Sequence, residues 1–173
     1  MLFRSPLSLV MGADTAGYLF YAGRYDEAME QMQKTLLEEP DFEPSHRQLG
    51  GIYEQMGRYA EAIETFERLR DLSGGVTYSL TALAHAYALS GRREDAMRML
   101  ARLDEVGKRK YVSPYGLAAV HVALGDADRA FAILDRAVQA HDRALIWLKV
   151  SPRWDRIRPD PRLRAILRTV GAE

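Results

Sequence analysis

The sequence contains no cysteine in its 173 residues. This absence excludes structural disulfides, thiolate zinc sites and cysteine nucleophiles. Long apolar runs are also missing, since no stretch approaches the roughly 18 residues that a membrane-spanning helix needs. We therefore expect a protein with no membrane association.

The first eleven residues are the one segment that resembles a secretory leader. They carry a single basic residue and a short apolar stretch, but Pro6 interrupts that stretch and Asp14 follows soon after it. A signal peptide needs an apolar region of about 7–15 residues and a cleavage site of small residues. We therefore expect a cytoplasmic location.

Charge of either sign is not in excess overall, because 24 basic residues balance 24 acidic ones. The distribution is uneven: residues 1–142 hold 16 Lys/Arg and 21 Asp/Glu, while residues 143–173 hold eight and three. The basic tail could attract phosphates, or its arginines could pair with the acidic surface of the preceding residues. We favour the second interpretation, so nucleic acid is not the expected partner.

Four glycines recur at a spacing of 34 residues, and each is followed five residues later by an alanine. The glycines are Gly23, Gly57, Gly91 and Gly125, and the alanines are Ala28, Ala62, Ala96 and Ala130. A fixed period of this length is typical of a helix–turn–helix solenoid. Each glycine is expected to end the first helix of its repeat in a left-handed conformation.

The apolar residues within each repeat follow helical spacing on both sides of the glycine. In the second repeat the first helix presents Leu49, Gly50, Ile52 and Tyr53, and the second presents Ala62, Ile63, Phe66 and Leu69. Small residues recur at two of these positions, where two helices would cross closely. The pattern predicts repeats at residues 9–42, 43–76, 77–110 and 111–144.

These residues resemble the tetratricopeptide repeat (TPR) family. The segments Leu49-Gly50-x-x-Tyr53, Gly57, Tyr59 and Ala62-x-x-x-Phe66 match its pattern. The tryptophan that often opens the family's first helix is absent from all four repeats. The resemblance implies an all-α, right-handed α-solenoid of four helix–turn–helix repeats within residues 1–144, and a non-enzymatic protein-binding role.

The period ends after the fourth repeat, because Pro159 stands where a fifth glycine would fall. Residues 145–173 are expected to form capping helices: one near residues 142–150, a turn at residues 151–152, and a last helix from Pro161 to Val170. We expect three side chains to cover the open end of the fourth repeat: Trp147, Leu148 and Trp154. Terminal repeats need such caps.

A second resemblance concerns residues 111–115, Tyr-Val-Ser-Pro-Tyr, and the tail segments Trp147-Leu148-Lys149-Val150-x-Pro152 and Arg158-x-Asp160-Pro161-Arg162. They look like the closing part of the TPR regions in bacterial signalling proteins linked to kinases, winged-helix regulators or cyclases. The resemblance implies either an excised domain or a stand-alone protein. In an excised domain the first helix would have lost a neighbour, and four N-terminal residues would cover that end: Leu2, Phe3, Leu7 and Leu9.

The sequence shows no constellation for catalysis, metal or cofactor binding. None of the four histidines lies four residues from another, and His121 takes the position of Tyr53 and Tyr87, so we interpret it as structural. The Gly50-Gly51 pair lies within a helical pattern and is interpreted as close packing and not as a phosphate loop. We therefore expect no enzyme activity, no metal and no cofactor.

The candidate site is the concave groove that first helices line in this architecture. Its proposed peptide-binding residues are Phe20, Tyr21, Arg47, Gly51, Glu54, Tyr78, His85 and Tyr115. The aromatic side chains would bind the peptide, and Arg47 would pair with a carboxylate. A chaperone-tail clamp is not expected, because the chain has no asparagine. The alternative is that these residues pack internally or serve self-association into a homo-oligomer.

Overall fold

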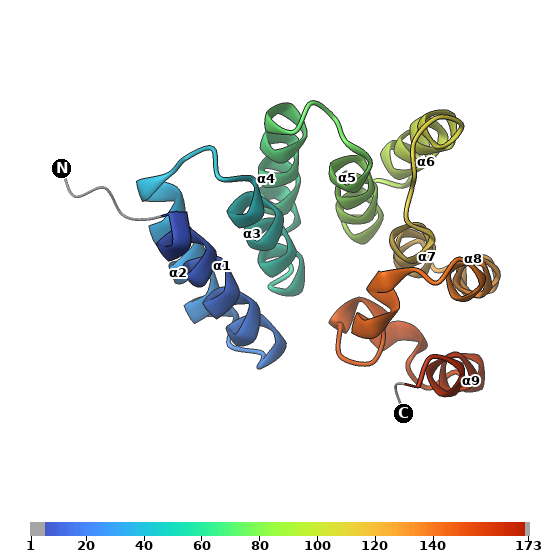
Figure 1. Cartoon of the computed structure of the whole chain (residues 1–173). Coiled ribbons are helices and arrows are strands. Elements are labelled where there is room, and N and C mark those ends of the chain that lie inside the picture. The colour runs from blue at the N-terminus through green and yellow to red at the C-terminus, as the bar shows by residue number, and fades with distance from the viewer. Residues whose placement is uncertain (1–5, 172–173) are drawn as a thin grey trace. The chain divides into compact units, whose positions relative to one another are not determined.

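A computed structural model describes residues 6–171, and within them every regular element is a helix (Figure 1). The chain divides into two compact units, an N-terminal lobe of residues 1–79 and a C-terminal lobe of residues 80–173. Within residues 6–171, none of the helices combines the length and the apolar character that crossing a bilayer requires.

The N-terminal lobe consists of two helix pairs and the first turn of a fifth helix. Helix α1 packs against α2 and α3, α2 packs against α3, and α3 packs against α4 (Figure 1). The helices are α1 (Pro6–Tyr21), α2 (Tyr25–Glu38), α3 (Glu43–Gln55), α4 (Tyr59–Leu72) and the start of α5 (Thr77–Leu89).

The C-terminal lobe contains the rest of α5 and the elements that follow it. Helix α7 packs against α8 and against the short 3₁₀ helix η2, and α8 packs against α9. The elements are α6 (Arg93–Gly107), α7 (Pro114–Ala123), α8 (Ala127–Gln139), η1 (Arg143–Trp147), η2 (Pro152–Ile157) and α9 (Pro161–Thr169).

The four repeating glycines end the first helices as the sequence predicts. Gly57 has a φ of +72°, and the following Arg58 N–H donates to the Tyr53 carbonyl over 2.9 Å. This bond spans five residues and satisfies a carbonyl that the helix end leaves open. The other three glycines have φ between +74° and +80°, so each first helix turns sharply into its second.

Small residues stand where the paired helices cross. All four repeating alanines are fully buried. At Gly50 an added Cβ would lie 2.3 Å from a ring carbon of Phe66, so this position has no room for a side chain. The close-packing interpretation of the Gly50-Gly51 pair is therefore confirmed at Gly50 and wrong at Gly51, where an added Cβ would meet nothing within 4 Å.

The C-terminal cap differs from its prediction in one segment. The helix expected over residues 142–150 is a short 3₁₀ helix, Arg143–Trp147, and a second 3₁₀ helix begins at Pro152 where a turn was expected. Ser151 has extended backbone angles, because the ring of the following Pro152 clashes with a helical conformation of the residue before it. The chain therefore breaks at the expected place, residues 151–152, and α9 lies where it was expected.

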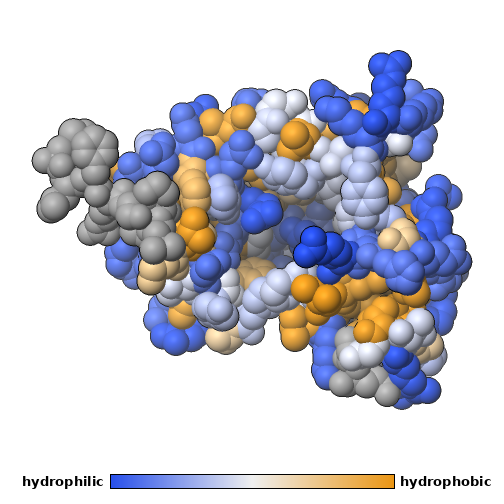
Figure 2. Space-filling view, in the orientation of Figure 1, coloured by the Kyte–Doolittle hydropathy of each residue, from blue (hydrophilic) through white to orange (hydrophobic). Residues whose placement is uncertain are grey.

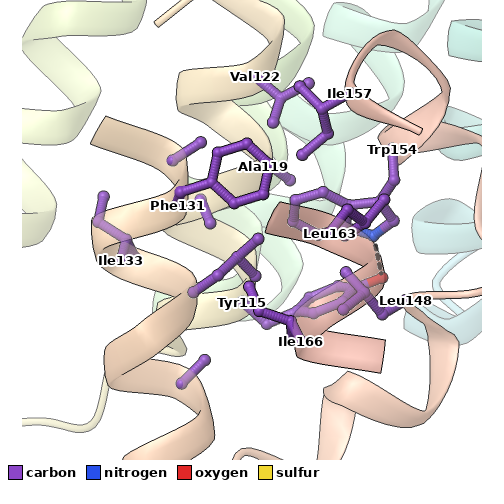
Figure 3. Close-up of a cluster of buried hydrophobic side chains, with 14 of the residues drawn as sticks. Tyr115, Ala119, Val122, Phe131, Ile133, Leu148, Trp154, Ile157, Leu163 and Ile166 are labelled. Carbon is purple, nitrogen blue, oxygen red and sulfur yellow. Dashed lines mark hydrogen bonds between the residues drawn. The ribbon is translucent and has the colours of Figure 1, made fainter. Parts of the chain in front are cut away.

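Two of the three residues expected to cover the fourth repeat do so. Leu148 and Trp154 are fully buried among side chains of α7, α8 and α9, whereas Trp147 is 43% exposed. Figure 3 shows Trp154 beside Tyr115, with its indole N–H donating to the tyrosine hydroxyl over 2.9 Å. Of the predicted N-terminal cover, Leu9 is half-buried, and Leu2, Phe3 and the Leu7 side chain lie outside the described residues.

Candidate functional site

Two of the predicted site residues, Arg47 and Tyr78, line the same surface depression of the N-terminal lobe. The depression has a volume of about 420 Å³, and the loop before α3, the first turns of α3 and the first turn of α5 form it. Its full lining is Asp41, Phe42, Glu43, Pro44, Arg47 and Tyr78. One predicted residue of the second repeat and one of the third therefore meet in one place.

The loop that enters α3 is fixed by local contacts. Pro44 stands in the first turn of α3, where its missing N–H costs no hydrogen bond. The His46 ring nitrogen Nε2 lies 2.7 Å from the Pro40 carbonyl, and Asp41 pairs with Arg68 of α4 over 2.5 Å. One rim of the depression is therefore tied to the helix pair behind it.

The polar groups of the depression are two carboxylates that are already paired, Glu43 and Asp41, the Tyr78 hydroxyl, and one cation. The Tyr78 hydroxyl donates to Glu43 Oε2 over 2.5 Å. Partial burial and this bond to a carboxylate raise the pKa of Tyr78, and the positive charge of Arg47 acts in the opposite direction. Arg47 is exposed and forms no ion pair with the described part of the chain. Its guanidinium is thus available to a carboxylate from outside.

Glu43 is the site residue that the sequence reasoning missed. It lies one turn before Arg47 on α3 and fixes the Tyr78 hydroxyl. Acidic residues are common in the first turn of a helix because they favour its positive end, so Glu43 does not stand out in the sequence. A pairing of Glu43 with Tyr78 requires knowledge of where α5 begins relative to α3.

The remaining predicted site residues of the N-terminal lobe lie elsewhere. The rings of Phe20 and Tyr21, at the end of α1, contact each other edge to face with centroids 5.2 Å apart. Gly51 is half-buried, and a Cβ there would meet nothing within 4 Å. Glu54 is only 3% exposed, which leaves little of it for a ligand.

The two predicted site residues of the C-terminal lobe are buried. His85 is 3% exposed and Tyr115 is 9% exposed. The Tyr115 ring packs edge to face on Trp154, with centroids 4.9 Å apart, and burial raises the pKa of its hydroxyl. We therefore assign Tyr115 to the core of the lobe (Figure 3) and leave it out of the site proposed below.

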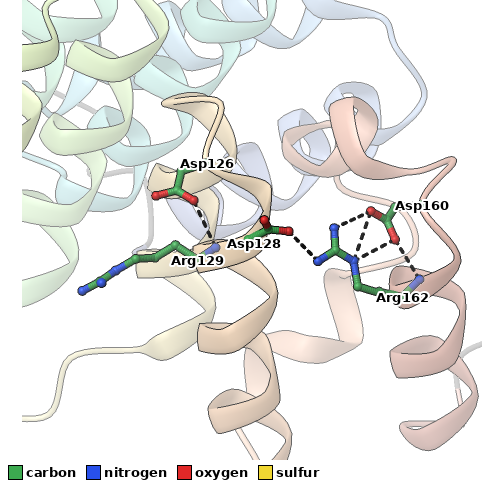
Figure 4. Close-up of polar contacts among 5 residues, drawn as sticks. All are labelled: Asp126, Asp128, Arg129, Asp160 and Arg162. Atoms are coloured by element: carbon green, nitrogen blue, oxygen red, sulfur yellow. Dashed lines mark hydrogen bonds and ion pairs between the residues drawn. The ribbon is translucent and has the colours of Figure 1, made fainter.

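Several arginines of the basic tail are engaged by groups within the C-terminal lobe. Arg162 of α9 binds Asp160, the N-cap residue of that helix, and Asp128 of α8, each over 2.8 Å (Figure 4). Its guanidinium lies 4.1 Å from the centre of the Phe131 ring. Arg158 binds Asp155 over 2.6 Å. Of these contacts, the one to Asp128 agrees with the expectation that tail arginines pair with the acidic surface of the preceding repeats, whereas Asp155 and Asp160 belong to the tail itself.

The described residues offer no group of three or more histidine and carboxylate side chains that could hold a metal ion. The depression contains one carboxylate that is already bound by Tyr78 and another that is bound by Arg68. The depression also presents an unpaired guanidinium, a phenol held by a hydrogen bond, and apolar walls at Phe42 and Pro44.

Paired helices joined by glycine turns define a helical-repeat protein. Sequence models of the tetratricopeptide repeat match residues 19–75, 55–113 and 115–136. Because these matches cover more than half of the chain, it belongs to the tetratricopeptide repeat family. Such repeats generally mediate protein–protein interaction, and their fold is typically a non-enzymatic scaffold.

Solved structures support the same fold. A kinesin light chain-like protein of Podosopora anserina with nearly identical TPR-like repeats is 18% identical, over 98% of this chain and 96% of that chain, with a TM-score of 0.59. A substituted variant of that protein is 19% identical, over 98% of this chain and 89% of that chain, with a TM-score of 0.60. No curated protein matches the sequence significantly. The predicted family and the helical-repeat fold are thereby confirmed.

Proposed function

We propose that the chain is a non-enzymatic interaction module that binds a peptide segment of a protein partner in the depression between α3 and the start of α5. The observation that carries this proposal is the meeting of Arg47 and Tyr78, both exposed, in one depression. A bacterial signalling context and a cytoplasmic location, as expected from the sequence, remain part of the proposal.

Binding would use the two halves of the depression differently. Arg47 would bind a carboxylate of the peptide through two parallel N–H donors, which is the geometry that a guanidinium favours. An apolar side chain of the peptide would pack on Pro44 and the Tyr78 ring. The bond from Tyr78 to Glu43 holds that ring in place before binding, and such pre-organisation reduces the entropy that binding costs.

The test is a pull-down from a lysate of the source organism, read by mass spectrometry. The wild-type protein is compared with a Tyr78→Ala/Arg47→Ala double variant and with Tyr18→Ala as the control. Tyr18 is 79% exposed and lies on α1, away from the depression. We expect a partner retained by the wild type and the control and lost from the double variant, because truncated binding hot spots typically cost about 2 kcal/mol or more.

Thermal unfolding separates a binding defect from a folding defect. The double variant should melt within a few degrees of the wild type, because both side chains are exposed. Retention of the same partner by the double variant and the wild type would contradict the proposed site. A matched loss of binding and of thermal stability would contradict it as well.

Self-association is the second candidate function, and one surface of the C-terminal lobe favours it. Figure 2 shows hydrophobic surface over the segment around η1 and η2, which is drawn in orange in Figure 1. Ile146, Trp147 and Val150 are exposed there, at 68%, 43% and 51%. Exposed apolar side chains that gather in one patch commonly mark an interface.

A further inference from the structure

The C-terminal lobe contains a second cavity, about 890 Å³ in volume, between α6, α7 and α8. Helix α7 and its C-terminal end contribute three half-buried residues spaced four and three apart: Leu117, His121 and Leu124. Residues of α6 and α8 flank them, including Leu100 and Ile133. The cavity therefore has an apolar base with a single histidine in it.

The repeats themselves show why this base is unusual. In the second and third repeats a tyrosine of the first helix lies under the arginine that follows the glycine: Arg58 is 4.7 Å from the Tyr53 ring centre, and Arg92 is 4.5 Å from that of Tyr87. In the fourth repeat the equivalent positions hold His121 and Asp126. Two shorter side chains have thus replaced a stacked pair.

The replacement leaves a polar atom of the base unsatisfied. His121 Nδ1 is buried without a hydrogen-bond partner in the described chain, and it lies 3.8 Å from Asp126 Oδ2, beyond hydrogen-bond length. The other Asp126 oxygen accepts the Arg129 backbone N–H over 3.1 Å and caps α8. Asp126 is therefore held by the helix end and does not close over the histidine.

The charged groups around the cavity are mostly cationic. Its lining carries five basic residues, Arg93, Lys108, Lys110, Arg129 and Arg136, and two acidic ones, Asp104 and Asp126. Lys108 is paired with Glu105, and Arg93 donates to the Leu124 carbonyl. Arg129 and Arg136 form no ion pair with the described residues, and Figure 4 shows the Arg129 side chain extending away from Asp126 and Asp128.

We propose that this cavity is a second binding site, which takes an acidic peptide segment carrying an apolar side chain. The unpaired guanidinium groups of Arg129 and Arg136 meet its carboxylates, and the base formed by Leu117, Leu124 and Ile133 receives the apolar side chain. The exposed rim residues Met97 and Tyr111 extend the apolar contact. An apolar base beneath a cationic rim favours such a peptide over a nucleic acid, which would offer it only phosphates and base faces.

This site does not rest on the function proposed above. It uses the second helices α6 and α8 of the C-terminal lobe, whereas the depression at Arg47 and Tyr78 belongs to the N-terminal lobe. The two proposals can therefore fail separately.

The test is fluorescence anisotropy of the full chain with a fluorescein-labelled amphipathic peptide of glutamate and leucine. A matched peptide with glutamine for every glutamate and a single-stranded RNA of equal length serve as comparison probes. We expect the glutamate peptide to bind at least about tenfold more tightly than the glutamine peptide, since complementary charge governs such contacts. Equal binding of both peptides, or tighter binding of the RNA, would overturn the proposal.

Charge reversal locates the binding. An Arg129→Glu/Arg136→Glu double variant should lose about tenfold or more in affinity for the glutamate peptide. An Arg102→Glu/Arg164→Glu variant is the matched control, because it changes the net charge equally at exposed positions of the same lobe outside the cavity lining. An equal loss of peptide affinity in both variants would show that the peptide is attracted by the overall charge of the protein, and would contradict a specific site in the cavity.

A variant that restores the stacked tyrosine–arginine pair of the second and third repeats tests whether the shape of the cavity, and not only its charge, governs peptide binding. A His121→Tyr/Asp126→Arg variant adds positive charge but fills the base of the cavity, as in the second and third repeats. We expect weaker peptide binding in spite of the added charge. Tighter binding by this variant would overturn the proposal; should the variant fail to fold, as circular dichroism would reveal, the charge-reversal pair decides alone.

Discussion

At the scale of single residues, the fourth repeat differs from the earlier repeats at two equivalent positions. Arginine follows the glycine in the first three repeats, and Asp126 follows it in the fourth. The same repeat exchanges tyrosine for His121. The two exchanges lie side by side in space, with 3.8 Å between Nδ1 and Oδ2, so they act on one local environment.

His121 should make the stability of the protein depend on pH. Burial lowers the pKa of its imidazole; Arg129 and Arg93 lower it further, and Asp126 opposes them. As the pH falls through the ordinary histidine pKa of about 6.5, the unfolded chain binds a proton that the folded chain resists, so acidification reduces stability. One such proton gives a slope of at most about 1.4 kcal/mol per pH unit.

The measurement is urea unfolding of the wild type and a His121→Gln variant at several pH values between about 7 and 5, which span the ordinary histidine pKa. The variant should lose less stability on acidification, because glutamine does not titrate. Its slope against pH, and not its absolute stability, is the informative quantity, since glutamine also changes the packing. Identical slopes for the two proteins would show that His121 titrates alike in both states.

At the scale of elements, the 34-residue period predicts where the repeat helices lie, whereas the secondary structure of the tail after the fourth repeat is harder to predict. Gly57 and its counterparts adopt a left-handed backbone wherever they occur, so glycine spacing alone locates the turns. Residues 142–157 have no period, and Ser151 before Pro152 divides them into two 3₁₀ helices. The sequence predicts the break at residues 151–152, but the helix expected over residues 142–150 is a 3₁₀ helix of five residues.

Fewer of the site residues than of the helices could be predicted, because burial by the C-terminal cap is not encoded in the repeat pattern. Arg47 and Tyr78 belong to faces that repeat geometry identifies, and both line the depression. Tyr115 was expected on the same face of the fourth repeat, yet it is buried because Trp154 folds back over it. The sequence predicts a cap, but it does not specify which side chains of the last repeat the cap covers.

The cap itself yields a prediction at this scale. A Trp154→Phe substitution should destabilise the protein by about 1–3 kcal/mol, because it removes the indole donor from the buried Tyr115 hydroxyl and leaves space in the core. Trp147→Phe is the matched control, since Trp147 is 43% exposed, and should change the stability by about 0.5 kcal/mol or less. Denaturant unfolding measures both, and equal effects would contradict the assigned role of the cap.

At the scale of the whole molecule, the two candidate recognition surfaces differ in chemistry. The depression at Arg47 and Tyr78 contains acidic groups that are already paired, so its one free charge is a single guanidinium. The cavity of the C-terminal lobe has several cationic groups above an apolar base. A chain with no net charge thus gathers positive charge locally, and the acidic partner proposed above would be attracted to that place and not to the surface at large.

The apolar patch at Ile146, Trp147 and Val150 gives the last prediction, which concerns assembly. If a second copy of the chain covers it, the interface uses the same residues from both copies, and mass in sedimentation equilibrium should rise with protein concentration. An Ile146→Ser/Val150→Ser variant should remain a monomer under the same conditions. Leu37→Ser is the control, because Leu37 is 84% exposed in the N-terminal lobe, and it should associate as the wild type does. A wild-type protein that stays monomeric at the highest concentration would show that self-association through this patch is wrong.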